Sequence, residues 1–206
     1  MVVRKEPVVL PTRIMACDGW ILNRKLIGWL KDNTTMEITI VVYRYHDLVF
    51  DAPRIASTGQ QGLIHALAKA ADRGVQLTFV TRDPLTDNAD PMRPEAISGW
   101  YRGLKRLAQI EGTRVLIHNN LHAKIYLVKR GDEKVFYAVG SSNLTYQGMG
   151  FRWEECNVVG YSPLEYQEVE KQVGRIISGR EILGLAEWKL KASKNLANAR
   201  FLAYLV

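Results

Sequence analysis

The sequence of 206 residues is poor in cysteine and proline, with two and seven of them respectively. Two isolated cysteines, Cys17 and Cys156, cannot form the disulfide framework that stabilises small secreted domains. No apolar run approaches the ~20 residues that a membrane-spanning helix requires, and the first residues lack the pattern of a secretory signal peptide. We therefore expect a cytoplasmic protein that has reduced cysteines and no membrane span.

Negative charge is also scarce, because 21 acidic residues stand against 28 lysines and arginines and leave a net charge of +7. The excess favours a polyanionic partner, and nucleic acid and anionic lipid both fit. The four histidines do not follow metal-ligand spacing, so we expect neither a metal ion nor another cofactor. With 47% hydrophobic residues, the chain has enough apolar side chains for a real core.

Helical and strand-like periodicities alternate along the chain. This order predicts an α/β fold, with a mixed β-sheet flanked by helices. We divide the chain into a main domain over 1–180 and a helical appendage over 181–206. Gly74 is expected to end one helix, and residues 83–94 are expected to form a loop. The predicted helices cover 20–31, 59–73, 95–109 and 164–178, and the predicted strands cover 37–43, 75–81, 113–118 and 155–160, besides a hairpin.

The appendage carries an apolar stripe at helical spacing and several basic residues. One interpretation is a helix docked on the core or on a dimer partner. The other is a basic amphipathic helix that binds nucleic acid or membrane. Docking is favoured because the stripe is short and the charges are not confined to one face. The stripe consists of Leu185, Trp188, Ala192, Leu196 and Ala199.

Two short motifs lie on the two arms of the predicted hairpin. His122-Ala123-Lys124 lies in the apolar run 121–128, and Gly140-Ser141-Ser142-Asn143 ends the run 135–141. Gly131-Asp132 between the runs predicts a two-residue hairpin turn. The two motifs are therefore expected to lie side by side.

In the register that this turn sets, His122 faces Ser141 across the ladder. Side chains alternate along a strand, so His122 and Lys124 share one face, and Asn143 can reach the same point. An imidazole, an ammonium, a hydroxyl and a carboxamide then converge. This set suits a phosphodiester, because it supplies a nucleophile or acid, a cation for the phosphate charge and neutral donors for its oxygens.

The two motifs resemble those of the phospholipase D superfamily, whose core is H-x-K followed by G-[SG]-x-N and a carboxylate on a later strand. Glu155 stands where that carboxylate is expected, and Glu154 is the adjacent alternative with the opposite facing. The helix-to-strand junction at 70–75 also resembles the superfamily pattern. The resemblance spans about residues 15 to 180, and the two motifs together make it fairly specific.

One position departs from the family pattern, which usually continues H-x-K-x-x-x-x-D. Lys129 stands in place of the aspartate, and Asp132 in the turn is not an obvious replacement. By alternation, residue 129 points to the opposite face from His122 and Lys124. The missing aspartate is therefore expected to have touched supporting structure rather than the phosphate.

The resemblance implies a mechanism and an assembly. Active sites of this superfamily use two motifs in a two-fold arrangement, so a chain with one motif should form a homodimer with one site at the interface. His122 would attack phosphorus and form a phosphohistidine, and the partner's His122 would protonate the leaving oxygen. Lys124 and Asn143 would hold the phosphate oxygens, Ser141 would position a histidine or the phosphate, and Glu155 would orient the imidazole.

The residues after the first long strand are candidates for substrate binding. Tyr43, Arg44 and His46 follow a buried-type strand. Strand ends often line sites, and tyrosine or arginine can stack on bases.

Three functions remain open and are ranked. The first is an endonuclease that cleaves DNA, which is favoured over RNA, without a metal. Small single-motif members of the superfamily are often nucleases, some attached to restriction or other defence systems and so to larger protein complexes. The second is a non-catalytic nucleic-acid-binding or assembly module, to which Lys129 gives weight. The third is a phospholipid phosphodiesterase, which predicts an exposed apolar rim.

Overall fold

The computed structural model describes residues 15–45, 59–85, 103–105, 107–145, 149 and 155–193, and it leaves the side chains of 59–65 undescribed. These residues form one eight-stranded sheet in which β2, β3 and β4 are parallel and the other pairings are antiparallel. The predicted mixed sheet is therefore confirmed. In spatial order the strands are β1 (Met15–Cys17), β7 (Asn157–Gly160), β6 (Val135–Gly140), β5 (Lys124–Arg130), β2 (Thr35–Val42), β3 (Gln76–Arg82), β4 (Thr113–His118) and β8 (Ile182–Gly184).

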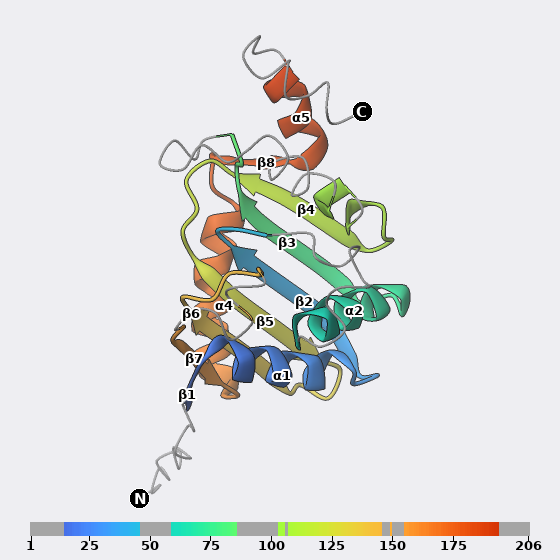
Figure 1. The fold of residues 1–206 in the computed structure, drawn as a ribbon, viewed down its shortest axis with the longest axis vertical. Coiled ribbons are helices and arrows are strands. Elements are labelled where there is room, and N and C mark those ends of the chain that lie inside the picture. The colour runs from blue at the N-terminus through green and yellow to red at the C-terminus, as the bar shows by residue number, and fades with distance from the viewer. Residues whose placement is uncertain are drawn as a thin grey trace, which may run out of the picture.

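Helices cover both faces of this sheet (Figure 1). The helices α1 (Gly19–Leu30) and α2 (Gly59–Asp72) lie on one face, and α4 (Pro163–Ile177) lies on the other. The short α5 (Leu185–Ser193) follows β8 at the sheet edge. This is the arrangement expected when parallel strands are joined by crossover helices.

Local sequence signals set the ends of these helices. The Asp18 carboxylate accepts a hydrogen bond from the backbone N–H of Ile21 at 2.7 Å and caps α1. Ser162 caps α4, whose first residue is Pro163. Gly74 follows α2 with φ of +83°, the left-handed conformation that glycine adopts without strain. The prediction that Gly74 ends this helix is confirmed.

The core has two layers, one on each side of the sheet. The larger layer packs α1 and α2 against the sheet and includes Leu22, Phe79, Tyr126 and Phe136. The smaller layer packs α4 against the opposite face. Its members include Val41, Val80, Ile125, Leu127, Tyr137, Tyr166 and Val173.

Most predicted elements match the observed ones within a few residues. Two strands were missed, β1 and β8, because three residues are too few to display an alternating pattern. Of the predicted helix 95–109, residues 103–105 and 107–108 are helical and the others that the structure describes are not. Of the predicted loop 83–94, only 83–85 is described, and it forms a turn.

The predicted hairpin register is wrong by one residue. The turn has three residues rather than two: Glu133 adopts φ of 62°, and the N–H of Arg130 donates to the carbonyl of Lys134 at 2.9 Å. The strands consequently pair Ile125 with Val139. His122 is therefore not opposite Ser141, and it precedes β5 rather than lying in it. A non-glycine residue in the left-handed region is uncommon, so the sequence pointed to the shorter turn.

The described part of the C-terminal segment joins the main fold. β8 pairs with β4, and Trp188 and Ala192 of α5 are buried in the larger core layer. The favoured interpretation, a docked helix, holds for these residues, whereas Leu196 and Ala199 lie outside the described residues. Within the part of the chain that the structure describes, every helix is too short or too polar to cross a bilayer.

Candidate functional site

The motif residues gather at one end of the sheet, where parallel strands end and antiparallel ones begin. β5 is antiparallel to β2, and Val42 at the end of β2 pairs with Lys124 at the start of β5. β2 and β3 are parallel, so Arg82 at the end of β3 lies at this edge as well. β6 ends at Gly140 on the other side of β5. Sheet topology therefore brings together residues that are distant in sequence.

His122 and Lys124 form the centre of the site. The Lys124 ammonium lies 3.4 Å from each of the two ring nitrogens of His122, and it donates a hydrogen bond to the His122 carbonyl at 2.8 Å. Lys124 is buried, with 7% of its surface exposed, whereas His122 is exposed. The prediction that the two side chains converge is confirmed for these residues.

Both residues of this pair have a lowered pKa. The charge of Lys124, then burial and the charge of Arg82, lower the pKa of His122 below its ordinary value of 6.5. This shift favours the neutral imidazole, which has a lone pair for attack on phosphorus. Burial also lowers the pKa of Lys124; the Glu155 carboxylate opposes this shift and the Arg44 guanidinium adds to it.

Ser141 and Glu155 form a linked pair beside the lysine. The Ser141 hydroxyl donates to the Glu155 carboxylate and accepts the backbone N–H of Cys156 at 2.9 Å. The sequence analysis expected Glu155 to orient the imidazole, but within this chain its hydrogen-bond partner is Ser141. Glu155 acts on the centre of the site through its charge on Lys124.

Asn143 forms a hydrogen bond with the segment that follows β2. Its Oδ1 accepts a hydrogen bond from the backbone N–H of Arg44 at 2.9 Å. This bond assigns the amide orientation and makes the Nδ2 group the donor end of the side chain. Asn143 and Arg44, 99 residues apart, are thereby fixed relative to one another.

Two buried side chains that the sequence analysis did not single out support the second motif. The Asn157 amide donates to the Ser142 hydroxyl at 2.8 Å and accepts the Ser142 N–H at 3.3 Å. The Tyr126 hydroxyl donates to the Ser142 carbonyl at 2.9 Å. Asn157 and Tyr126 are each 1% exposed, so these bonds are shielded from water. Each residue lies in a strand, where sequence alone does not reveal its partner.

Tyr43 connects the first motif with the neighbouring strand ends. Its ring centroid lies 5.0 Å from that of His122. The charged groups of Arg44, Arg82 and Lys124 each lie 5.2 Å from the centroid of the same ring. Tyr43 and Arg44 were predicted to bind substrate, and the structure brings both to the motif residues. Arg82 was missed, although the reasoning that singled out residues after the first long strand applies equally to the end of β3.

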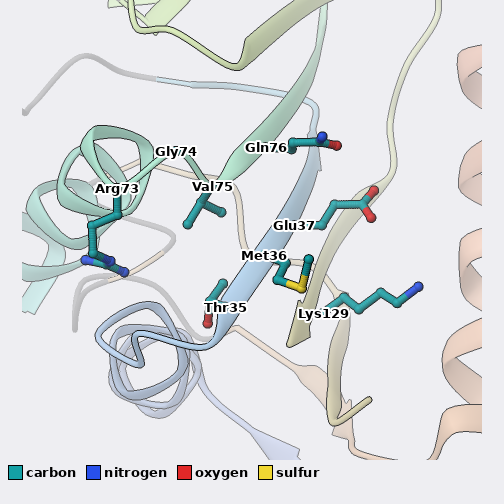
Figure 2. A pocket seen from close by; sticks show the side chains of 8 residues that line it. All are labelled: Thr35, Met36, Glu37, Arg73, Gly74, Val75, Gln76 and Lys129. Carbon is teal, nitrogen blue, oxygen red and sulfur yellow. The ribbon is translucent and has the colours of Figure 1, made fainter. Parts of the chain in front are cut away.

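Other predicted residues lie elsewhere. His46 and Glu154 are outside the described residues. Lys129 is exposed near the far end of β5, opposite Glu37 of β2. It lines a cavity of about 350 Å³ (Figure 2). There Glu37, Gln76 and Lys129 point toward the α4 side of the sheet. Lys129 also lies near the opposite end of β5 from Lys124.

Gly140 gives a test of how tightly the second motif is built. A Cβ atom at this position would lie 2.4 Å from the Cys156 carbonyl oxygen and 2.6 Å from the Asn157 Cα. Gly140→Ala should therefore displace β7 and the Ser141–Glu155 pair and lower the free energy of unfolding by about 1–3 kcal/mol. Chemical denaturation measures this loss. Gly28→Ala is the matched control, because no atom lies within 4 Å of its added Cβ; equal effects of the two variants would contradict the close packing.

The low pKa of His122 gives a second test. Lys124→Met removes the cation that contributes most to lowering it, so the pKa of His122 should rise toward 6.5. The sign follows because a neighbouring positive charge disfavours the imidazolium. Histidine ring resonances followed by NMR against pH measure the change, and His122→Gln assigns the resonance. An unchanged or lower pKa in Lys124→Met would show that the ammonium does not control this histidine.

Comparison with known proteins places this site in a family. The family model described as cardiolipin synthase, PLD-like domain, matches residues 32–177. Nuc of Salmonella typhimurium, a phospholipase D family member, is 13% identical with a TM-score of 0.55, over 84% of this chain and 96% of Nuc. NucT of Helicobacter pylori is 12% identical with a TM-score of 0.56, over 84% of this chain and 99% of NucT.

The phosphatidylserine synthase of Haemophilus influenzae Rd KW20 has a TM-score of 0.59 at 13% identity, over 98% of this chain and 49% of the synthase. A comparison with curated protein sequences found no match. Identities this low establish a shared fold and leave the activity to be argued from the site. Because the family model covers well over half of the residues and both motifs, the chain belongs to the phospholipase D-like family.

Proposed function

We propose that the protein is a metal-independent phosphodiesterase, and specifically an endonuclease that cleaves DNA in preference to RNA. The observation that carries the proposal is the His122–Lys124 pair, in which a buried ammonium lies 3.4 Å from each imidazole nitrogen and lowers the pKa of that imidazole. A neutral imidazole is the nucleophile, and the cations around it replace a metal as the source of positive charge for the phosphate. The overall charge of +7 supports a polyanionic substrate.

In the first step, the lone pair of a His122 ring nitrogen forms a bond to phosphorus. The bond between phosphorus and the leaving oxygen breaks, and that oxygen takes a proton from the partner subunit's His122. Lys124 and the donor end of Asn143 hold the non-bridging oxygens, on which negative charge builds up. Asn143 suits this role because its Oδ1 already accepts the Arg44 N–H.

In the second step, water attacks the phosphohistidine. The partner subunit's His122 accepts a proton from the water, the phosphorus–nitrogen bond breaks, and the electron pair returns to the ring nitrogen. The two imidazoles hold different protonation states at each stage, so they titrate as a coupled pair. The Ser141–Glu155 pair fixes the edge of the site and offsets part of the lysine charge.

Two further candidates each have a supporting observation. A phospholipid phosphodiesterase is supported by the similarity to the cardiolipin synthase domain model and to the Haemophilus phosphatidylserine synthase, whose names both concern phospholipids. A binding module without catalysis is supported by the loss of the motif aspartate. Its support is weak, because Lys129 faces the α4 side of the sheet and not the His122–Lys124 pair.

The proposed activity is tested by incubating labelled single- and double-stranded DNA and RNA with the protein in excess EDTA. Wild-type protein should cleave DNA under these conditions, and His122→Ala should abolish cleavage because it removes the nucleophile. Lys129→Ala is the control, since Lys129 lies near the opposite end of β5 from Lys124, and it should cleave as the wild type does. Binding without cleavage by the wild type would favour the binding module, and cleavage only of phospholipid vesicles would favour the lipid enzyme.

The proposed shared site is tested by mixing wild-type and His122→Ala subunits in varying ratios after unfolding and refolding together. If each site needs the histidines of two subunits, activity should fall with the square of the wild-type fraction. Analytical ultracentrifugation of each mixture checks that dimers have formed. Activity that falls in direct proportion to the wild-type fraction would mean that each chain works alone.

A further inference from the structure

We propose that Arg82, together with Tyr43 and Arg44, forms a subsite for the phosphate next to the one that His122 attacks. The inference rests on the proposed function and deepens it, because such a subsite serves a nucleic-acid strand and not an isolated phosphodiester. Arg82 then positions the substrate and does not act on the reacting atoms.

The sheet order separates this subsite from the point of attack. β2 lies between β5 and β3, so Tyr43 at the end of β2 stands between Lys124 at the start of β5 and Arg82 at the end of β3. Strands in a sheet are about 4.8 Å apart, which puts the Lys124 and Arg82 backbones about 10 Å apart. Both charged groups nevertheless lie 5.2 Å from the Tyr43 ring centroid. Lys124 and Arg82 are therefore cations from two different strands that share Tyr43 as a neighbour.

The subsite is built on fixed backbone. The N–H of Arg44 is held by Asn143, and the residue after Arg82, Asp83, donates its N–H to the His118 carbonyl at 2.9 Å. The Asp83 carboxylate in turn accepts the N–H of Leu85 at 2.9 Å. Tyr43, Arg44 and Arg82 are each half-buried. A half-buried guanidinium on a rigid strand end loses little further freedom when it binds an anion.

The residue types fit a phosphate. A guanidinium offers a planar set of donors that matches phosphate oxygens two at a time, whereas an ammonium acts as a point charge. The Tyr43 ring tolerates several cations near it because its π faces are negative.

Arg82 is also electrostatically coupled to the reaction centre, since its charge contributes to lowering the pKa of His122. A phosphate bound at Arg82 offsets that charge. A strand of nucleic acid supplies a phosphate on each side of the scissile one, whereas a phosphatidyl group supplies a single phosphodiester. The contribution of Arg82 to binding should therefore depend on whether a flanking phosphate is present.

The test compares one substrate that lacks flanking phosphates with one that has them. Bis(p-nitrophenyl) phosphate is the first, and a labelled single-stranded oligodeoxynucleotide is the second. Arg82→Gln should lower kcat/KM for the oligonucleotide about tenfold more than for the small diester, the scale of one charge-assisted hydrogen bond. The loss should fall mainly on KM. Each variant is compared at its own pH optimum, because Arg82 also affects the pKa of His122.

Arg114→Gln is the matched control. Arg114 is an exposed arginine on β4. It is paired with Thr78 of β3, which lies four residues before Arg82, so Arg114 is near the opposite end of the strands from the site. It should not change the ratio of the two activities. Arg82→Lys should restore part of the oligonucleotide activity, because charge is kept while the paired donors are removed. Arg82→Gln should also lower the slope of log binding constant against log salt by about 0.7 for each phosphate that the variant no longer neutralises.

Three results would overturn the subsite. An equal loss on both substrates in Arg82→Gln would mean a structural or catalytic role. An unchanged salt slope would mean that Arg82 binds no phosphate. Hydrolysis of phosphatidylglycerol vesicles with the same dependence on Arg82 would mean that flanking phosphates are irrelevant. If the wild type hydrolyses none of these substrates, the proposed activity fails, and the salt slope of oligonucleotide binding by wild type and Arg82→Gln still decides on the subsite.

Discussion

The antiparallel pairing of β5 with β2 is the constraint on which the site depends. It places the start of one strand beside the end of the other, with Lys124 opposite Val42. If β5 ran parallel to β2, the His122–Lys124 pair would lie at the opposite edge of the sheet from Tyr43 and Arg82. Parallel strands normally gather functional residues at their carboxyl ends. Here one reversed strand adds His122 and Lys124 to strand ends that already carry a tyrosine and two arginines.

The positive charges at this end of the sheet disfavour the charged form of Lys124, and they also favour the neutral form of His122. Burial and the charge of Arg44 disfavour the charged form of Lys124, and the charges of Lys124 and Arg82 disfavour protonation of His122. The resulting neutral imidazole is what an attack on phosphorus requires. The cost is offset locally by the Glu155 carboxylate and structurally by the buried bonds from Asn157 and Tyr126 to Ser142. The site is thus arranged for an anion.

The departure at Lys129 is compatible with this arrangement because the two faces of the sheet are separate environments. Residues 124 and 129 are an odd number of positions apart, so their side chains lie on opposite faces. Lys129 pairs with Glu37 beside α4, at the end of β5 that is remote from His122. A lysine in place of the family's aspartate at this position therefore lies against α4, at the other end of β5 from the His122–Lys124 pair.

The sequence by itself determined the elements and the chemical groups. Alternation and the terminating glycine are local signals, so they predicted most of the strands, the end of α2 at Gly74 and the shared face of His122 and Lys124. Two motifs were enough to indicate the family. Tertiary structure decided the rest. The turn at Glu133 set the hairpin register, Ser141 rather than the imidazole became the partner of Glu155, and Arg82 joined Tyr43. Local periodicity determines the face of the sheet on which a side chain lies. The order of the strands in the sheet determines which strand ends are neighbours, and the packing of the whole chain sets that order.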